Sequence, residues 1–185
     1  NQVNVSSNTI AYNNLHGLET DASSWGNIFT NNTIRNNAGD GAHLGGQGNQ
    51  LGTSLLSANG GCGVTLASGQ GNYIFSDSIT NNAGFGGVCI TGAPSGVSTV
   101  TADGITSFYL LFNNTITGNS GPGVVITSGM YRARLKANLI HDNTALEIDL
   151  VGRPGAGDQP QIAPQLSVAD DGDLTAAQDP DQGVP

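Results

Sequence analysis

The sequence has few charged residues and few aromatic ones. Of its 185 residues 10% are charged and 5% are aromatic, and five Lys and Arg stand against 14 Asp and Glu, so the net charge is −9. A nucleic-acid-binding protein needs a basic surface, and this composition argues against that class. No apolar run approaches the roughly 18 residues of a membrane-spanning helix, so we expect no membrane span in this chain.

The sequence also lacks features that would place it in a compartment. It has only two cysteines, Cys62 and Cys89, which alone do not fix the redox environment. It has no signal peptide and begins with Asn1 rather than methionine. We therefore expect a processed chain or a piece of a longer one.

Glycine and asparagine are abundant instead, and they recur at fixed positions. The pattern Ile-x-x-Asn, with Leu in place of Ile in one copy, occurs six times at intervals of 22 to 24 residues, apart from one interval of 37. The copies are Ile10/Asn13, Ile34/Asn37, Leu56/Asn59, Ile79/Asn82, Ile116/Asn119 and Ile140/Asn143. A glycine follows most of the asparagines by four residues, and an apolar-x-apolar triplet follows each glycine. Such a period indicates a repeat architecture.

Each repeat contains three short strand signals separated by polar turns. Three strands in 22 to 24 residues predict one coil of a parallel solenoid, in which equivalent residues of stacked coils lie about 4.8 Å apart. We expect aliphatic columns inside and asparagine ladders at the turns. We expect the repeat glycines Gly17, Gly41, Gly63, Gly87 and Gly123 to supply positive φ at the corners. A second corner reads Gly-Asn at Gly26-Asn27, Gly48-Asn49 and Gly71-Asn72.

The repeat resembles the right-handed parallel β-helix family, also described as pectate-lyase-like solenoids, whose coils often read N-x-I-x-x-N-x-x-x-G-I-x-L. The resemblance runs from about Asn4 to Leu150 and implies an all-β fold of about six coils with three short strands each. Repeats of this kind are found in bacterial extracellular and cell-surface proteins. The family includes polysaccharide lyases, hydrolases, epimerases and adhesins, so the fold alone does not choose the function.

The repeat predicts two regions and one interruption. Residues 1–151 form the β-helix, with a side insertion at about 92–107, and residues 152–185 form a Pro-rich acidic segment or linker. The insertion alternates about Asp103-Gly104, which is a hairpin signal. Asp103 is either a ligand or partner contact or part of a tolerated surface insertion. The C-terminal segment either covers the last coil or is a linker.

Two groups of residues could carry catalysis if the chain is an enzyme acting on polysaccharide. Glu19 and His43 fall in one outward column, one coil apart, and could form an acid–base pair or a solvated ion pair. His141 and Asp149 fall in the last coil. Basic residues of that region could contact a partner or protect an exposed edge: Arg132, Arg134 and Lys136.

Three further features leave alternatives open. Trp25 either packs on the flank of the coil or stacks on a sugar. Asp170, Asp171 and Asp173 are weak candidates for Ca²⁺, and we expect no other cofactor. In register, an offset of three residues would separate the Cα atoms of Cys62 and Cys89 by about 10 Å, too far for a disulfide, unless the extra residue before Gly87 changes the register.

No dense column of charged residues appears, and the surface is acidic and poor in lysine. We therefore expect a non-catalytic extracellular or cell-surface protein with a structural, adhesive or filament-forming role. Its partners would be carbohydrate or another surface protein, with end-to-end self-association as a further mode. The alternative is a polysaccharide-active enzyme of the lyase, hydrolase or epimerase type.

Overall fold

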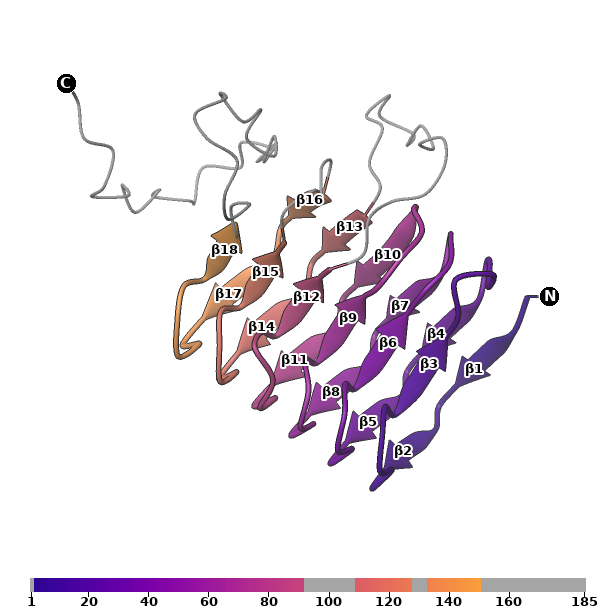
Figure 1. Cartoon of the computed structure of the whole chain (residues 1–185), viewed down its shortest axis with the longest axis horizontal. Coiled ribbons are helices and arrows are strands. Elements are labelled where there is room, and N and C mark those ends of the chain that lie inside the picture. The colour runs from indigo at the N-terminus through magenta and orange to yellow at the C-terminus, as the bar shows by residue number, and fades with distance from the viewer. Residues whose placement is uncertain (1, 92–108, 128–132, 151–185) are drawn as a thin grey trace.

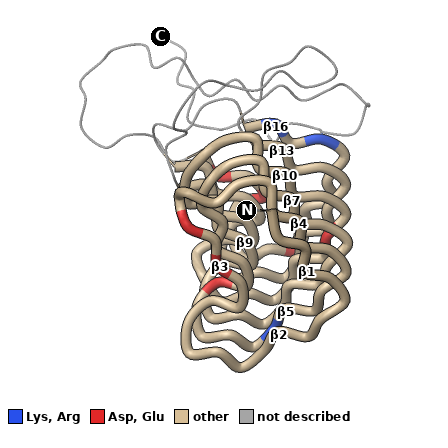
Figure 2. The backbone as a smooth tube through the Cα atoms, turned by 90° about the vertical axis from the view of Figure 1, so that its right-hand side faces the viewer, with Lys and Arg blue, Asp and Glu red and all other residues tan. Residues whose placement is uncertain are grey.

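The chain winds into a stack of triangular coils. The computed structural model describes residues 2–91, 109–127 and 133–150, so the insertion at 92–107 and the segment 152–185 lie outside the described residues. Figure 1 shows the coils succeeding one another along the long axis, and Figure 2, which looks along the stack, shows them superimposed. The described residues are all-β, and the winding is right-handed, as the repeat predicts.

In the described ranges, eighteen strands form three parallel sheets of six, one sheet for each side of the coil. Sheet A contains β1 (Asn4–Ser6), β4 (Ile28–Thr30), β7 (Gln50–Gly52), β10 (Asn72–Phe75), β13 (Tyr109–Phe112) and β16 (Ala133–Lys136). Sheet B contains β2 (Thr9–Ala11), β5 (Thr33–Arg35), β8 (Leu55–Ser57), β11 (Ser78–Thr80), β14 (Thr115–Thr117) and β17 (Leu139–His141). Sheet C contains β3 (Leu18–Thr20), β6 (Ala42–Leu44), β9 (Val64–Leu66), β12 (Val88–Ile90), β15 (Val124–Ile126) and β18 (Ile148–Leu150).

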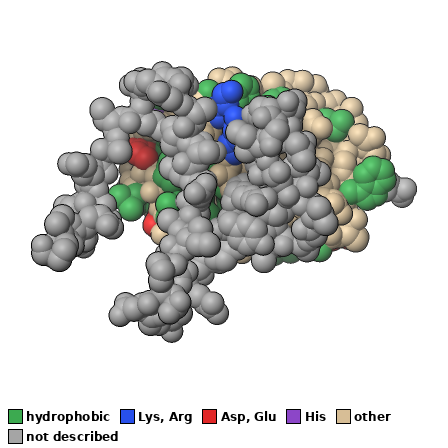
Figure 3. All heavy atoms as spheres, turned by 90° about the horizontal axis from the view of Figure 1, so that it is seen from above, with side chains coloured by type: hydrophobic (Ala, Val, Ile, Leu, Met, Phe, Trp, Pro, Cys, Tyr) green, Lys and Arg blue, Asp and Glu red, His purple; other side chains and the backbone are tan. Residues whose placement is uncertain are grey.

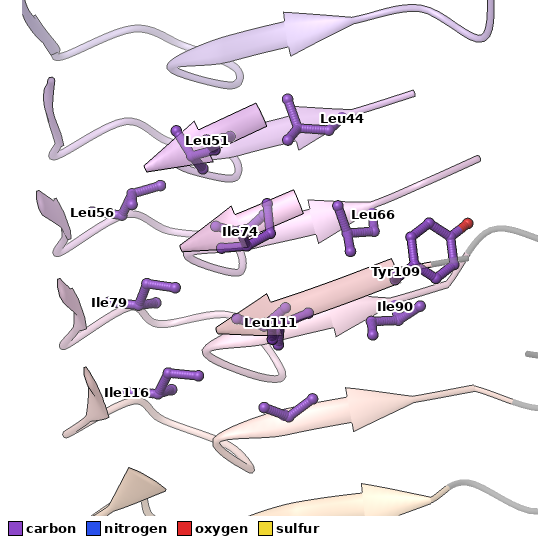
Figure 4. Close-up of a cluster of buried hydrophobic side chains, with 14 of the residues drawn as sticks. Leu44, Leu51, Leu56, Leu66, Ile74, Ile79, Ile90, Tyr109, Leu111 and Ile116 are labelled. Carbon is purple, nitrogen blue, oxygen red and sulfur yellow. The ribbon is translucent and has the colours of Figure 1, made fainter. Parts of the chain in front are cut away.

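The register of each sheet follows the repeat. In sheet B the central residues of neighbouring strands pair in the order Ile10, Ile34, Leu56, Ile79, Ile116 and Ile140. In the four inner coils these side chains are fully buried. Figure 4 shows Leu56, Ile79 and Ile116 pointing into the coil together with apolar side chains of the other two sheets. The predicted aliphatic core is therefore confirmed.

Asparagines form hydrogen-bonded ladders at the corners. Between sheets B and C each amide Nδ2 donates to the Oδ1 of the next coil at 2.8 to 3.0 Å, from Asn13 through to Asn143. A second ladder at the Gly-Asn corner joins Asn27, Asn49 and Asn72. The ladders satisfy buried polar groups that would otherwise destabilise the coil.

The predicted role of the repeat glycines is wrong, because none of Gly17, Gly41, Gly63, Gly87 and Gly123 is among the positive-φ glycines. These glycines are required by close approach instead. A Cβ on Gly87 would lie 2.6 Å from Cγ2 of Ile116 and 2.7 Å from the carbonyl oxygen of Gly123. Only a residue without a side chain lets successive corners stack at this spacing.

Positive φ occurs one residue before each asparagine of the ladder between sheets B and C, and one residue before each stacked polar residue at the corner between sheets A and B. These residues are mostly not glycine, and their φ values lie between 51° and 67°. They are Ser7, Tyr12, Asn31, Asn36, Thr53, Ala58, Ser76, Asn81, Asn113, Gly118, Ala137 and Asp142. The Gly-Asn corner does use glycine in this conformation, at Gly26, Gly48 and Gly71.

Cys62 and Cys89 form a disulfide, with their Cα atoms 6.3 Å apart. The predicted separation of about 10 Å assumed a straight extension from Thr65, the register partner of Cys89, back to Cys62. The register itself is as expected. Cys62 lies on the corner before β9, however, and because the chain bends there, its Cα is closer to that of Cys89 than a straight strand would allow.

Candidate functional site

An open groove of about 370 Å³ runs across three successive coils at the corner between sheets C and A. Each coil contributes one side chain and the glycine that follows it, namely Trp25-Gly26, Gln47-Gly48 and Gln70-Gly71. Main-chain hydrogen bonds fix the stack, since the Gly26 N–H donates to the Gln47 carbonyl and the Gly48 N–H to the Gln70 carbonyl, both at 2.9 Å. We call this feature the Trp25 groove.

Trp25 is 56% exposed, so a large part of its indole faces solvent while the rest lies against the coil. The turn before it is held by Asp21, whose Oδ1 accepts hydrogen bonds from the hydroxyls of Ser23 and Ser24 and from the Ser23 N–H. These hydrogen bonds, led by that of the Ser23 side chain, lower the pKa of Asp21.

The glutamines of the groove differ in exposure. Gln47 is exposed, whereas Gln70 is buried and its Oε1 has no hydrogen-bond partner. A buried amide oxygen without a partner is unusual in a folded protein. The groove therefore combines an apolar aromatic face with amide groups and carries no charged side chain.

A second cluster lies on the corner before sheet C and contains His16, Asp40 and His43. Asp40 Oδ2 lies 2.8 Å from His43 Nδ1 and 3.4 Å from His16 Nδ1. The two imidazole rings stack with their centroids 4.5 Å apart. One metal-ligating atom from each residue lies within 4.8 Å of the others. We call this feature the His16 cluster.

The predicted pair of Glu19 and His43 is only partly realised. Glu19 and His43 are register partners on β3 and β6, as expected. Among the described residues, however, His43 takes Asp40 as its carboxylate partner, and no hydrogen bond or ion pair joins it to Glu19. His16 and Asp40 were not predicted from the sequence. Both immediately precede a repeat glycine. Aligning the repeats at this glycine would have placed His16 and Asp40 next to each other in neighbouring coils.

The charged residues of the last coil are spread over different sheets. His141 lies on β17 and its Nδ1 is 2.8 Å from Asp142 Oδ2, whereas Asp149 lies on β18. In the described part of the chain no hydrogen bond or ion pair joins His141 to Asp149. Arg134 is buried and Lys136 exposed on β16. Figure 3 shows basic side chains gathered in one cluster on the face seen from above.

Five predicted residues lie outside the described residues, namely Asp103, Arg132, Asp170, Asp171 and Asp173. The structure therefore does not address the predicted contact at the insertion or the weak Ca²⁺ candidates. Within the described ranges, no helix is long and apolar enough to cross a bilayer.

Comparisons with known proteins find a similarity to one family over the N-terminal part of the chain. Residues 1–79 match the family model described as "Right handed beta helix region". Comparisons with curated proteins and with solved structures returned no match. The same three-strand coil continues in register from the matched residues through β18, so the described residues fold as a right-handed parallel β-helix that is similar to this family.

Proposed function

We propose that this chain is a non-catalytic extracellular or cell-surface protein with an adhesive role, and that it binds a neutral carbohydrate in the Trp25 groove. The observation that carries the proposal is the exposed indole of Trp25 beside two glutamines on successive coils. An aromatic face supplies apolar contact for a sugar ring, and amides supply hydrogen bonds to hydroxyl groups.

The charge of the molecule favours a neutral glycan over an acidic one. The groove residues are uncharged, and the chain carries a net charge of −9. A polyanionic ligand such as a uronate polymer would be repelled by this field and would find no cation in the groove.

The disulfide supports an extracellular location. Disulfides form and persist in oxidising compartments and are rare in the cytosol. The Cys62–Cys89 bond joins the corner of one coil to a strand of the next. Filament formation by end-to-end stacking stays a prediction, which sedimentation of the same chain at increasing concentration would test.

Glycan binding by the whole chain tests the proposal. We expect neutral oligosaccharides to bind in calorimetry, Trp25→Ala to abolish the binding and Trp25→Phe to retain part of it. Phe85→Ala is the matched control, because Phe85 is also an exposed aromatic residue (64%) but lies at another corner. Binding that is lost equally in both alanine variants, or that no neutral glycan shows, would reject the groove as the site.

The alternative function, a polysaccharide-active enzyme, is favoured by one observation. Asp40 orients His43 through a contact of 2.8 Å, which is the arrangement of a histidine poised for proton transfer. An assay against neutral and uronate polysaccharides separates the two functions. Turnover that disappears in His43→Ala would establish the enzyme and overturn the non-catalytic assignment.

A further inference from the structure

We propose that the His16 cluster is a binding site for a divalent transition-metal ion, with His16, Asp40 and His43 as its protein ligands. This site is independent of the Trp25 groove and of the proposed carbohydrate binding. It is built from the corners of the first two coils and from β6, which lies next to them in sheet C.

The spacing of the donor atoms suits a metal ion. Ligand atoms bonded to Zn²⁺ at about 2.0 to 2.1 Å in a tetrahedral site lie about 3.3 Å from one another. Asp40 Oδ2 lies 2.8 and 3.4 Å from the two Nδ1 atoms, so these separations already bracket that value. All three ligand atoms lie within 4.8 Å of one another. A small movement of the two imidazoles toward each other would bring the remaining separation to the value expected around a metal ion.

The backbone holds the carboxylate in place. Asp40 Oδ1 accepts the N–H of Cys62 at 2.8 Å, which leaves Oδ2 directed at the imidazoles. The Asp40 N–H donates to His16 Nδ1 at 3.0 Å and orients that ring. The Cys62 contact holds the Asp40 oxygen that does not bind the ion, and contacts of this kind commonly tune the affinity of a metal site, whereas the Asp40 N–H must release His16 Nδ1 when the ion binds.

Two glycines make room for the cluster. A Cβ on Gly39 would lie 2.9 Å from His16 Nδ1, and a Cβ on Gly61 would clash with Asp40 Oδ1. The corners of two coils therefore close tightly around the ligand groups, and the solenoid fixes their positions before any ion arrives.

The donor set selects the class of ion. Two imidazoles and one carboxylate suit Zn²⁺, Ni²⁺ or Cu²⁺, whereas Ca²⁺ and Mg²⁺ require a shell made of oxygen atoms. The side chains of His16, Asp40 and His43 are 26%, 13% and 29% exposed, so water can complete the coordination. A ligating nitrogen must offer a free lone pair, so at Nδ1 of His16 the ion replaces the hydrogen bond from the Asp40 N–H.

Titration of the full chain with Zn²⁺ and Ni²⁺ tests the site. We expect one ion per chain, a higher melting temperature with the ion and no comparable effect of Ca²⁺. His16→Ala and His43→Ala should each weaken binding about tenfold or more. The matched control is His141→Ala, since His141 also contacts an aspartate at 2.8 Å but has no second histidine beside it. Unchanged binding in His43→Ala, or an equal loss in His141→Ala, would overturn the proposal.

A spectroscopic measurement on the unaltered chain covers the case in which a histidine variant does not fold. Ni²⁺ should broaden or shift the imidazole proton resonances of His16 and His43 at low molar ratios and leave those of His141 sharp. Broadening of all three histidines to the same degree, or of none, would show that the cluster is not a site.

Discussion

At the scale of single residues, Asp77 is the one carboxyl in the described polar column at the corner between sheets A and B. The other members of this column, which are linked from coil to coil by hydrogen bonds, are Asn8, Asn32, Ser54, Asn114 and Asn138. Its side chain is 2% exposed, its Oδ1 accepts the N–H of Ser54 at 2.7 Å, and its Oδ2 has no partner. In the next coil Asn114 occupies the same column, and its Nδ2 donates to the Ile74 carbonyl at 3.0 Å. Asp77 thus places an acceptor where the ladder uses a donor, and burial raises the pKa of Asp77 to about 7.

The first prediction is a pH dependence of stability caused by Asp77. The pKa rises from 3.8 to about 7 on folding, so between these values the folded state holds a proton that the unfolded state has released. The free energy of unfolding therefore falls as the pH rises through this window and levels off above it. The change is at most about 4 kcal/mol, because each pKa unit corresponds to about 1.4 kcal/mol.

Asp77→Asn should remove this dependence, since an amide restores the donor of the ladder at every pH. Denaturant melts at pH 5 and pH 8 measure the effect, and the variant should be the more stable protein at pH 8. Asp142→Asn is the control, because its carboxylate is 85% exposed. An unaltered pH slope in Asp77→Asn would show that Asp77 ionises freely in the folded chain.

The second prediction compares Asn119 with its neighbour Thr117. Asn119 is fully buried, its Oδ1 accepts both donors of Asn82, and its Nδ2 donates to Asn143 Oδ1. Asn119→Leu should lower the free energy of unfolding by about 3 kcal/mol, because each buried group left unpaired costs about 1 to 3 kcal/mol. Thr117→Ala, on the partly exposed side of β14, should change it by less than about 0.5 kcal/mol. Equal costs in denaturant melts would contradict this assignment of buried and exposed positions.

At the scale of the structural element, the corners use glycine for two different reasons. Gly41 has no positive φ, but a Cβ there would lie 2.6 Å from the Gly63 carbonyl oxygen and 2.8 Å from Asn59 Nδ2. Gly48 has a φ of 66°, yet the nearest atom to an added Cβ is 3.9 Å away. The first position is limited by contact between coils and the second by backbone conformation alone.

The third prediction is that Gly41→Ala destabilises the protein more than Gly48→Ala. A left-handed alanine costs about 1 to 2 kcal/mol, which sets the expected loss at Gly48. At Gly41 the backbone of the next coil must move and the asparagine ladder with it, so the loss should exceed this value. Thermal melts of the two variants provide the comparison, and a larger loss at Gly48 would mean that the corners separate easily.

The elements could be predicted from the sequence because each coil repeats the same contacts. The paired triplets after the repeat glycines, such as Val64 with Val88, follow directly from the columns. The spacing of the repeat does not determine how the chain bends at each corner. For this reason the sequence did not predict the contact of His16 with His43 or the bond of Cys62 with Cys89, although both join a corner to a strand one coil further on.

The candidate sites were predictable only where a residue type is rare. Trp25 is the single tryptophan of the chain, so the sequence alone identifies it as a candidate contact residue. Gln47 and Gln70 are ordinary surface residue types, and they join Trp25 in a groove only because the coils stack in register. Aligning the residues before the repeat glycines relates Asp40 to His16, but the contact of Asp40 with His43 depends on the three-dimensional path of the corner.

At the scale of the whole molecule, the solenoid has no single centre that all residues share. Each coil is buried by the coils on either side, so stability is the sum of contributions from coils and from interfaces between neighbouring coils. Ile79 in the middle is fully buried, whereas the equivalent Ile10 and Ile140 are only partly buried. Local opening should therefore require less free energy in the first described coil than in the fourth.

The fourth prediction is a gradient of amide hydrogen exchange along the stack in the 185-residue chain. The amides of β8 and β11 should exchange slowest, and those of β2 should exchange faster, because the inner strands have a neighbouring coil on both sides and opening them breaks two interfaces. Exchange followed by NMR or mass spectrometry measures this directly.

Ile79→Ala tests the physical cause of the gradient. It should remove core contacts on both sides of its coil, lower the free energy of unfolding by about 2 to 5 kcal/mol and reduce the protection of β8, β11 and β14 together. Ile10→Ala should leave the amides of β11 protected from exchange. Each coil is stabilised by its nearest neighbours, and the coils that contain β2 and β11 are not neighbours. Uniform protection across the six strands of sheet B would show instead that the stack opens as one cooperative unit, and the additive description of the coils would then be wrong.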